Sequence, residues 1–155
     1  MKGHEKIIAT LNALLCDELS AVNQYIVHSE MCANWGYEKL HAKIEKRAID
    51  EMKHAEKHIA RLLFLEGTPI VSKLREIHIG ADIPTQLDHD RKDEVGAVTA
   101  YNAAIREAAD LGDNGTREML ESILKDEEAH LDWLEAQLDQ VRQMGIQNYL
   151  VEQLG

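Results

Sequence analysis

The sequence predicts an all-α fold: a four-helix bundle with a long crossover between the second and third helices and a short fifth helix at the C-terminal end. Ala, Leu, Glu, Lys and Arg supply 69 of the 155 residues, a composition typical of long helices. Only two prolines occur, and the period-two alternation that indicates strands is absent. A chain of this length corresponds to one domain, expected over residues 1–155.

Apolar residues that recur every three or four positions define the first two helices. The first is expected from about His4 to Asn34, where Gly36 ends it, and the second from about Glu38 to Glu66, with Gly67 as its C-terminal cap. Their apolar faces are expected to comprise Ile8, Leu11, Leu15, Leu19, Val22, Tyr25 and Ile26 in the first helix and Leu40, Ile44, Ala48, Ala55, Leu62 and Leu65 in the second.

A long connection separates this hairpin, over about 4–66, from a second one over about 85–144. The predicted helices are Thr85 to Leu111, Thr116 to Met144 and a short one from Gln147 to Gln153. The connection from Gly67 to Ile83 can extend roughly 55 Å. A helix of about 27 residues is only about 40 Å long, so the connection can cross the full length of a bundle.

The charge balance excludes several classes of function. Seventeen Lys and Arg against 28 Asp and Glu give a net charge of −11, which disfavours nucleic-acid phosphates and anionic membranes. No apolar run approaches the roughly 20 residues of a spanning helix, and the opening MKGHEKII shows no apolar signal segment. Cys16 and Cys32 fit no disulfide framework, so reduced thiols and a cytoplasmic location are expected.

The chain repeats itself at an offset of 76 residues. Glu18-x-x-Ala-Val-x-x-Tyr25 returns as Glu94-x-x-Ala-Val-x-x-Tyr101, and Asp50-Glu51-x-x-His54 returns as Asp126-Glu127-x-x-His130. A single Glu-x-x-His is weak evidence, because a chain of this composition is expected to contain about one by chance. One such motif, Glu38-x-x-His41, has no counterpart 76 residues later, and we interpret it as a solvated helix start. Two motifs in register, each preceded at equal distance by a Glu, are strong evidence that these residues form one functional set.

Burial provides an independent argument. Glu18, Glu94 and Glu127 share the spacing of the apolar faces of their helices. Four carboxylates that face one core repel one another unless cations neutralise them. A bundle without metal would need buried basic partners, and only Arg47 and Arg106 are placed to serve.

The six residues fit a pair of metal ions. Residues three apart on a helix share a face, so each Glu-x-x-His can hold one ion. Carboxylates and imidazoles without thiolate suit iron or manganese. A Glu from each of two helices, with a Glu-x-x-His from each of the other two, is typical of carboxylate-bridged di-iron proteins. We predict Glu51 and Glu127 as bridging ligands, Glu18 and Glu94 as terminal ligands, and His54 and His130 as one imidazole per ion.

The whole chain resembles the bacterioferritins, the haem-carrying branch of the ferritin superfamily. The similarity covers MKG at the start, NQY at 23–25, IDEMKHA at 49–55, RLLFLEGTP at 61–69, DEEAHLDWLE at 126–135 and GIQNYL at 145–150. The resemblance implies a ferritin-like bundle in a hollow homo-oligomeric shell of 24 subunits. It also implies iron storage, in which a di-iron ferroxidase centre oxidises Fe(II) with dioxygen or peroxide and ferric mineral collects inside.

Through the same resemblance, Met52 is expected to be an axial ligand of a haem b that two subunits share across a two-fold axis. A thioether is a soft, neutral ligand that suits an electron-transfer haem. The haem is expected to return electrons for the release of stored iron, supplied by a ferredoxin-type partner. Without the resemblance, a Met on a helix face is usually a packing residue or a subunit contact.

The resemblance extends to residues around the centre. Tyr25 is expected to hydrogen-bond a ligand or lend an electron during oxidation, although such an aromatic residue is usually core, and Trp133 has the same two interpretations. Asp50 matches an accessory iron site on the inner wall, but Lys46 stands where many relatives have His, which counts against that site. The polar positions that line iron pores between subunits in related proteins are matched by Asn34, Glu66, Asp132 and Asp139, which are otherwise exposed polar residues.

Three alternatives stay open. One is a di-iron or di-manganese enzyme that consumes peroxide, such as a catalase or a rubrerythrin, although two cysteines cannot supply the four-cysteine iron domain of a rubrerythrin. A DNA-protecting ferritin relative is disfavoured, because it builds its site between subunits and often carries a basic tail. The third is a structural or interaction bundle without metal, against which the doubled ligand set argues.

Overall fold

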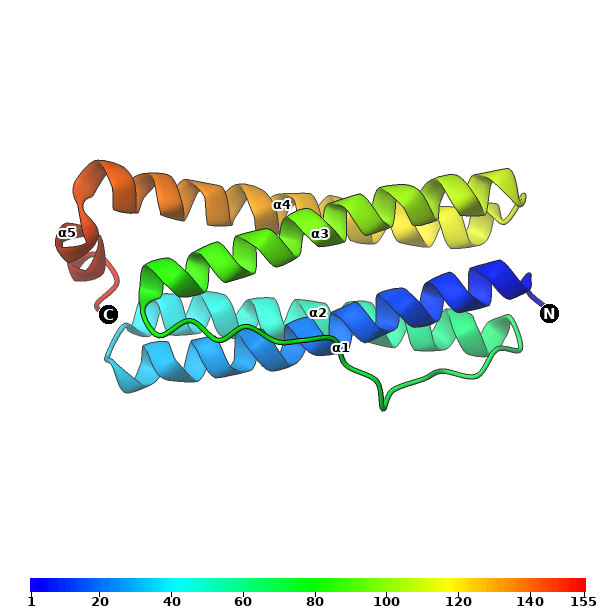
Figure 1. Ribbon diagram of the computed structural model, residues 1–155, viewed down its shortest axis with the longest axis horizontal. Coiled ribbons are helices and arrows are strands. Elements are labelled where there is room, and N and C mark those ends of the chain that lie inside the picture. The colour runs from blue at the N-terminus through cyan, green and yellow to red at the C-terminus, as the bar shows by residue number, and fades with distance from the viewer.

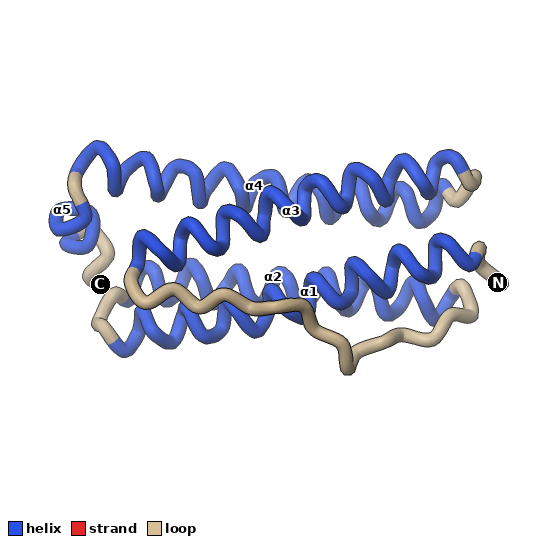
Figure 2. Tube along the Cα trace, viewed as in Figure 1, coloured by secondary structure: helices blue, strands red, loops and turns tan.

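The computed structural model describes residues 1–155 and consists of helices and loops. The helices are α1 (Glu5–Asn34), α2 (Glu38–Phe64), α3 (Ile83–Asp110), α4 (Asn114–Met144) and α5 (Ile146–Val151). The four long helices pack as two antiparallel hairpins, and residues 65–82 run back along the bundle, so that α3 is parallel to α2 and antiparallel to α1 (Figures 1 and 2). The predicted four-helix bundle with a long crossover and a short fifth helix is confirmed. None of the helices is long and apolar enough to cross a membrane.

The end of α2 differs from the prediction. The helix ends at Phe64, and the residue in the left-handed conformation is Glu66, at φ 61°, rather than Gly67. The amide of Gly67 donates to the carbonyl of Leu62 at 2.8 Å, which closes the helix end. Gly67 serves a different purpose, because a Cβ there would lie 3.0 Å from Ile8.

Side-chain caps start α3 and α4 two residues earlier than predicted. The carboxylate of Asp82 accepts a hydrogen bond from the amide of Thr85 at 2.9 Å, and that of Asp113 accepts one from Thr116 at 3.0 Å. Pro84 does not interrupt the pattern, because a proline in the first turn lacks only an amide that has no helical partner there.

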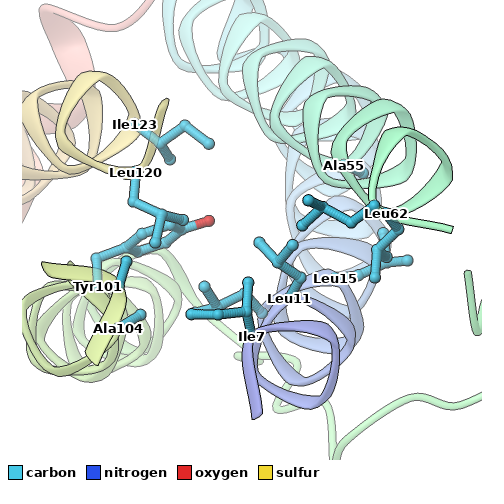
Figure 3. Close-up of a cluster of buried hydrophobic side chains, with 12 residues drawn as sticks. Ile7, Leu11, Leu15, Ala55, Leu62, Tyr101, Ala104, Leu120 and Ile123 are labelled. Atoms are coloured by element: carbon cyan, nitrogen blue, oxygen red, sulfur yellow. The ribbon is translucent and has the colours of Figure 1, made fainter. Parts of the chain in front are cut away.

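The apolar core is divided into two clusters that fill opposite ends of the bundle. The first contains Ile7, Leu11, Leu14, Leu15, Ala55, Leu62, Leu65, Tyr101, Ala104, Ala108, Leu120 and Ile123 (Figure 3). The second contains Tyr25, Cys32, Leu40, Ile44, Ala48, Ile83, Leu87, Leu134 and Tyr149. Buried polar residues occupy the layer between them. The apolar side chains therefore fix the helices on both sides of a polar middle.

The apolar face predicted for α1 is wrong at its C-terminal end. Ile26 is 47% exposed and Val22 is only half-buried, whereas Gln24, Tyr25 and His28 are buried. Ile26 follows Tyr25 by one residue, about 100° around the helix, so burying Tyr25 turns Ile26 outward. Hydrophobicity is a poor guide here, because the inward positions of this half of α1 are largely polar.

The helix α5 closes one end of the bundle. Tyr149 is completely buried in the second cluster, and its hydroxyl donates to Gln137 Oε1 at 2.8 Å. Gly145, at φ 80°, allows the chain to turn from α4 into α5. The carbonyl of Gln153 then accepts a hydrogen bond from the amide of Lys39 in the first turn of α2.

A buried polar pair fastens the crossover to the bundle. His28 Nδ1 lies 3.0 Å from Asp90 Oδ1, and His28 Nε2 accepts a hydrogen bond from the amide of Gly80 at 3.0 Å. Gln24 donates to Asp90 Oδ1 at 2.8 Å and accepts from the amide of His78. Both hydrogen-bonding faces of His28 are thus occupied, and its ring connects α1, α3 and the crossover.

The substitution His28→Ala should loosen the crossover. It leaves the buried Gly80 amide without its acceptor, which costs about 1–3 kcal/mol locally, so amide hydrogen exchange at Gly80 should accelerate about tenfold or more. Hydrogen-exchange mass spectrometry or NMR would measure it, with His4→Ala at the start of α1 as the control. Unchanged exchange at Gly80 would show that other contacts hold the crossover.

Candidate metal centre

Six ionisable side chains from four helices fill the polar layer between the two apolar clusters. They are Glu18 from α1, Glu51 and His54 from α2, Glu94 from α3, and Glu127 and His130 from α4, each at most 6% exposed. The structure thus brings together all six residues that the repeat singled out. Their role as metal ligands stays a prediction.

Helical register accounts for this convergence. In α2 and α4 the Glu and the His lie three residues apart, so both side chains leave the same face of the helix. In α1, Glu18 follows the buried Leu14 by four residues, and in α3, Glu94 follows the buried Leu87 by seven. Burial of the apolar residues on these faces carries the carboxylates into the interior.

The six side chains form two overlapping groups. One contains Glu18, Glu51, His54 and Glu127, and the other contains Glu51, Glu94, Glu127 and His130. Within each group the potential ligand atoms lie within 4.8 Å of one another. Glu51 and Glu127 belong to both groups, whereas Glu18 and Glu94 belong to one each. The arrangement could hold two cations with Glu51 and Glu127 between them.

Both histidines direct the same nitrogen into the centre. His54 Nδ1 lies 2.8 Å from Glu127 Oε1, and His130 Nδ1 lies 3.0 Å from Glu51 Oε1. On the other side of each ring, His54 Nε2 lies 3.0 Å from Asp126 Oδ2 and His130 Nε2 lies 3.4 Å from Asp50 Oδ2. A carboxylate behind the ring fixes the tautomer of a metal-binding histidine, which leaves Nδ1 as the ligand atom.

Asp50 and Asp126 were not predicted as partners of the histidines. The signal was available, because each precedes its Glu in both copies of the Asp-Glu-x-x-His motif. Each Asp contacts the histidine of the opposite hairpin, which the spacing alone does not reveal. Lys46 Nζ also lies 3.3 Å from Asp50 Oδ2, so Asp50 already has two partners.

Two tyrosines brace the carboxylates that belong to one group each. Tyr25 Oη donates to Glu94 Oε1 at 2.5 Å, and Tyr101 Oη donates to Glu18 Oε1. Tyr101 was not predicted as a site residue, although it is the counterpart of Tyr25 in the repeat. Burial, followed by the adjacent Glu charge, raises the pKa of both phenols well above 10, so both act as hydrogen-bond donors at neutral pH.

The two halves differ behind these tyrosines. His58 Nε2 lies 2.7 Å from Tyr101 Oη, whereas the position 76 residues later is the apolar Leu134. Burial lowers the pKa of His58 to about 4, so the ring is neutral at physiological pH. The Glu18–Tyr101 pair therefore has a third polar group, His58, whereas the Glu94–Tyr25 pair has an apolar residue at the equivalent position.

Unpartnered buried atoms test whether the site fits metal ions. The buried atoms without a hydrogen-bond partner include one from each of the six residues: Glu18 Oε2, Glu51 Oε1, His54 Nδ1, Glu94 Oε2, Glu127 Oε1 and His130 Nδ1. A buried polar atom without a partner costs free energy, and native proteins contain few of them. These oxygen and nitrogen atoms can coordinate metal ions, and their facing one another without hydrogen bonds fits bound cations.

The carboxylates respond unequally to this crowding. Burial, followed by the charges of Glu18 and Glu127, raises the pKa of Glu51 well above its ordinary value. Burial and Glu127 raise the pKa of Glu94 in the same way. Burial would also raise the pKa of Glu127, but protonated Glu94 and the two histidines outweigh it and hold that pKa well below normal. Without a cation, protons therefore occupy part of the centre.

His54 also carries a proton in the cation-free protein. Burial disfavours its charged form, but the carboxylates of Glu127 and Glu18 outweigh burial and raise the pKa of the ring to about 10. A cation that binds at Nδ1 has to displace this proton.

A metal-free bundle lacks the basic partners that it would need. Arg106 is exposed, and no Lys or Arg nitrogen lies within 4.0 Å of the four glutamates. Arg47 is buried, but its guanidinium lies over the ring of Trp133, 5.7 Å from the centroid. Trp133 is half-buried at the edge of the second cluster. Protons on His54 and on the carboxyl groups are the remaining means of balancing the charge.

The other predicted residues lie outside this centre. Met52 is 45% exposed and shares the outer surface of α2 with Ile49, at 42%. The four predicted pore residues, Asn34, Glu66, Asp132 and Asp139, are all exposed. Asn34 ends α1 and Glu66 follows the end of α2, at opposite ends of an antiparallel hairpin, whereas Asp132 and Asp139 lie within α4, so one subunit does not bring the four together.

The centre should make the cation-free protein less stable as the pH rises. The pKa values of Glu51, Glu94 and His54 are higher in the folded chain than in the unfolded chain, so their stabilising protons are lost with increasing pH. For His54 the loss is about 1.4 kcal/mol per pH unit between pH 6.5 and 10, and the protons of Glu51 and Glu94 add losses that begin above the ordinary carboxyl pKa. The variant Glu51→Gln keeps a neutral group and should show a shallower decline.

Thermal unfolding in excess chelator across this pH range would measure both slopes. Glu56→Gln, on the exposed face of α2, controls for the change in net charge. Equal slopes for Glu51→Gln and Glu56→Gln would contradict the assigned protonation of the centre.

Comparisons with known proteins agree with the fold. Residues 8–144 match the family model described as Ferritin-like domain. A bacterioferritin of Brucella melitensis is 40% identical over 96% of this chain and 92% of its own length. A bacterial ferritin of Paramagnetospirillum magnetotacticum is 40% identical over 100% and 96%, and one of Synechocystis is 39% identical over 99% of each. The chain belongs to the ferritin family and, within it, to the bacterioferritins.

Proposed function

We propose that this protein stores iron, and that it oxidises Fe(II) at the six-residue centre with dioxygen or peroxide before the ferric product is deposited as mineral. One observation carries the proposal. Each of the six side chains contributes a buried atom without a hydrogen-bond partner, and these side chains form two groups that share Glu51 and Glu127. The names of its relatives, bacterioferritin and bacterial ferritin, support iron as the substrate.

The donor set explains why iron would be accepted. Carboxylate and imidazole donors without thiolate favour iron or manganese. Four carboxylates balance the charge of two divalent ions, with Glu51 and Glu127 bridging and Glu18 and Glu94 terminal. Two Fe(II) ions held side by side supply two electrons together, which matches the reduction of dioxygen to peroxide or of peroxide to water.

The surrounding residues hold the ligands and move protons. Tyr25 and Tyr101 orient Glu94 and Glu18 through the hydrogen bonds that they donate. His54, with a pKa of about 10 in the cation-free protein, releases its Nδ1 proton when Fe(II) binds, and Asp126 keeps the opposite nitrogen protonated. Tyr25 is also the residue that we propose to lend an electron during oxidation.

The outer surface of α2 fits a haem shared between subunits. The thioether of Met52 is exposed and beside the exposed Ile49, so a ligand held there is covered only when a second subunit packs over it. We assign Met52 as an axial ligand of haem b, one haem for every two subunits. When bound, the haem would supply a one-electron couple for the release of stored iron.

The assembly that we propose is a homo-oligomeric shell of 24 subunits in the cytoplasm, with a ferredoxin-type protein as electron donor for iron release. The free thiols of Cys16 and Cys32 fit a reducing compartment. The net charge of −11 supports a cavity that attracts Fe(II).

Removal of both terminal carboxylates should abolish the fast oxidation of iron. In an anaerobic titration followed by oxygen or peroxide, the unmodified protein should bind two Fe(II) per subunit, one for each group, and oxidise them in a fast phase before slower mineral growth. The double variant Glu18→Ala with Glu94→Ala should lose this phase, by about 100-fold or more in rate.

Glu38→Ala is the matched control, because Glu38 is exposed and belongs to the Glu-x-x-His motif without a repeat partner. Intact binding and oxidation in the double variant would contradict the site assignment. Fast disproportionation of peroxide without net mineral would favour a peroxide-consuming enzyme. The absence of bound metal in the purified protein and in titrations would favour a structural bundle.

Substitution of Met52 should separate the haem from iron oxidation. Met52→Leu removes the thioether and should abolish the native haem spectrum, while Fe(II) oxidation proceeds within about twofold of its normal rate because no ligand of the centre changes. Absorption spectra of the purified protein would show it, with Met144→Leu, another exposed methionine, as the control. An unchanged haem spectrum in Met52→Leu would refute the assignment.

A further inference from the structure

A cavity of about 400 Å³ leads from the surface to the centre, between α1 and α3 and beneath the crossover. Glu18, Glu51, Glu94 and Glu127 line its inner part. Its outer part is formed by Asp17 and Asp93 together with Arg75, Glu76, His78 and Lys92. The carboxylates that form the centre are therefore accessible from this side of the bundle.

A single guanidinium spans the outer part of the cavity. Arg75 Nε lies 3.6 Å from Asp17 Oδ1, and Arg75 Nη2 lies 3.3 Å from Asp93 Oδ2. Asp17 and Asp93 are counterparts in the repeat and immediately precede Glu18 and Glu94. Arg75 thus connects the two walls of the cavity directly outside the centre.

The position of Arg75 is set by the backbone rather than by these ion pairs. Its amide donates to Ser20 Oγ at 3.0 Å, and His28 and Gln24 hold the crossover a few residues further on. The Arg75 side chain remains 29% exposed, and ion pairs of this kind contribute little to stability. The charge of Arg75 therefore contributes more to the electrostatics of the cavity than to the stability of the fold.

We propose that Arg75 is the gate of this passage, and that a divalent cation reaches the centre by displacing the guanidinium from Asp17 or Asp93. With Arg75 in place, its single positive charge offsets one of the two negative charges, and an incoming cation meets the guanidinium between the carboxylates. Once the guanidinium moves aside, the same carboxylates attract the cation toward Glu18 and Glu94. This inference rests on the proposed function, because it takes the centre as the destination of the cation.

Rapid mixing with Co(II), which requires no oxidant, tests the gate. The absorbance of Co(II) bound at the centre reports both the rate and the stoichiometry of binding. Arg75→Gln should bind Co(II) about tenfold faster than the unmodified protein, since a charge at a cleft changes association rates on this scale. Arg75→Lys keeps the charge and should stay near the original rate. Arg91→Gln is the control, because Arg91 pairs with Asp88 on α3 and does not line the cavity.

Two further measurements distinguish an electrostatic gate from a loosened crossover. At about 1 M salt, where charges are screened beyond about 3 Å, the advantage of Arg75→Gln should nearly disappear. Adding Asp17→Asn and Asp93→Asn to Arg75→Gln should slow the uptake again, because the attracting carboxylates are lost.

The outcomes separate the two proposals. If Arg75→Gln and the unmodified protein bind two Co(II) per subunit at the same rate, the centre stands and the gate is overturned. Acceleration that persists undiminished at high salt also overturns the gate, in favour of a steric effect of the crossover. If the unmodified protein binds no Co(II), the metal centre fails and the gate fails with it.

Discussion

The mutual repulsion of four buried carboxylates is the constraint on which the rest of this structure depends. Glu18, Glu51, Glu94 and Glu127 lie in a low-dielectric layer where they cannot all be ionised without cations. Two apolar clusters, one at each end of the bundle, stabilise the fold on both sides of this layer. The division of the core thus separates two tasks: its ends stabilise the bundle, and its middle holds an unfavourable arrangement of charge that a bound cation would relieve.

The polar layer also joins the two hairpins. Tyr25 of the first hairpin bonds Glu94 of the second, and Tyr101 of the second bonds Glu18 of the first. The histidines cross in the same way, toward Asp126 and Asp50. Each hairpin therefore holds predicted ligands of the other, so the relative position of the hairpins determines the geometry of the centre. A change in their packing would affect both groups of ligands at once.

Periodicity and register suffice for part of this arrangement. The helices, the crossover and the six converging residues follow from spacings of three, four and 76 in the sequence. Other features depend on contacts between distant segments. The outward turn of Ile26 follows from the burial of Tyr25, and the approach of Gly67 to Ile8 of α1 leaves little room for a side chain there. Arg75 contacts Asp17 and Asp93 on two helices that are distant from it in the sequence. Local hydrophobicity carries no information about such long-range partners.

The internal symmetry of the ligands contrasts with the asymmetry of what surrounds them. On the α1–α3 side, the cavity above the centre is lined by seven carboxylates against two basic side chains, Arg75 and Lys92. On the α2–α4 side, a second cavity of about 430 Å³ is lined by Lys43, Lys46 and Arg47, together with Asp50, Asp126 and His130. Basic residues repel a divalent cation, so the electrostatic field favours approach from the acidic side. The two sides of a nearly two-fold symmetric centre therefore differ in charge, and this difference favours the acidic side as the entrance in the passage that we propose.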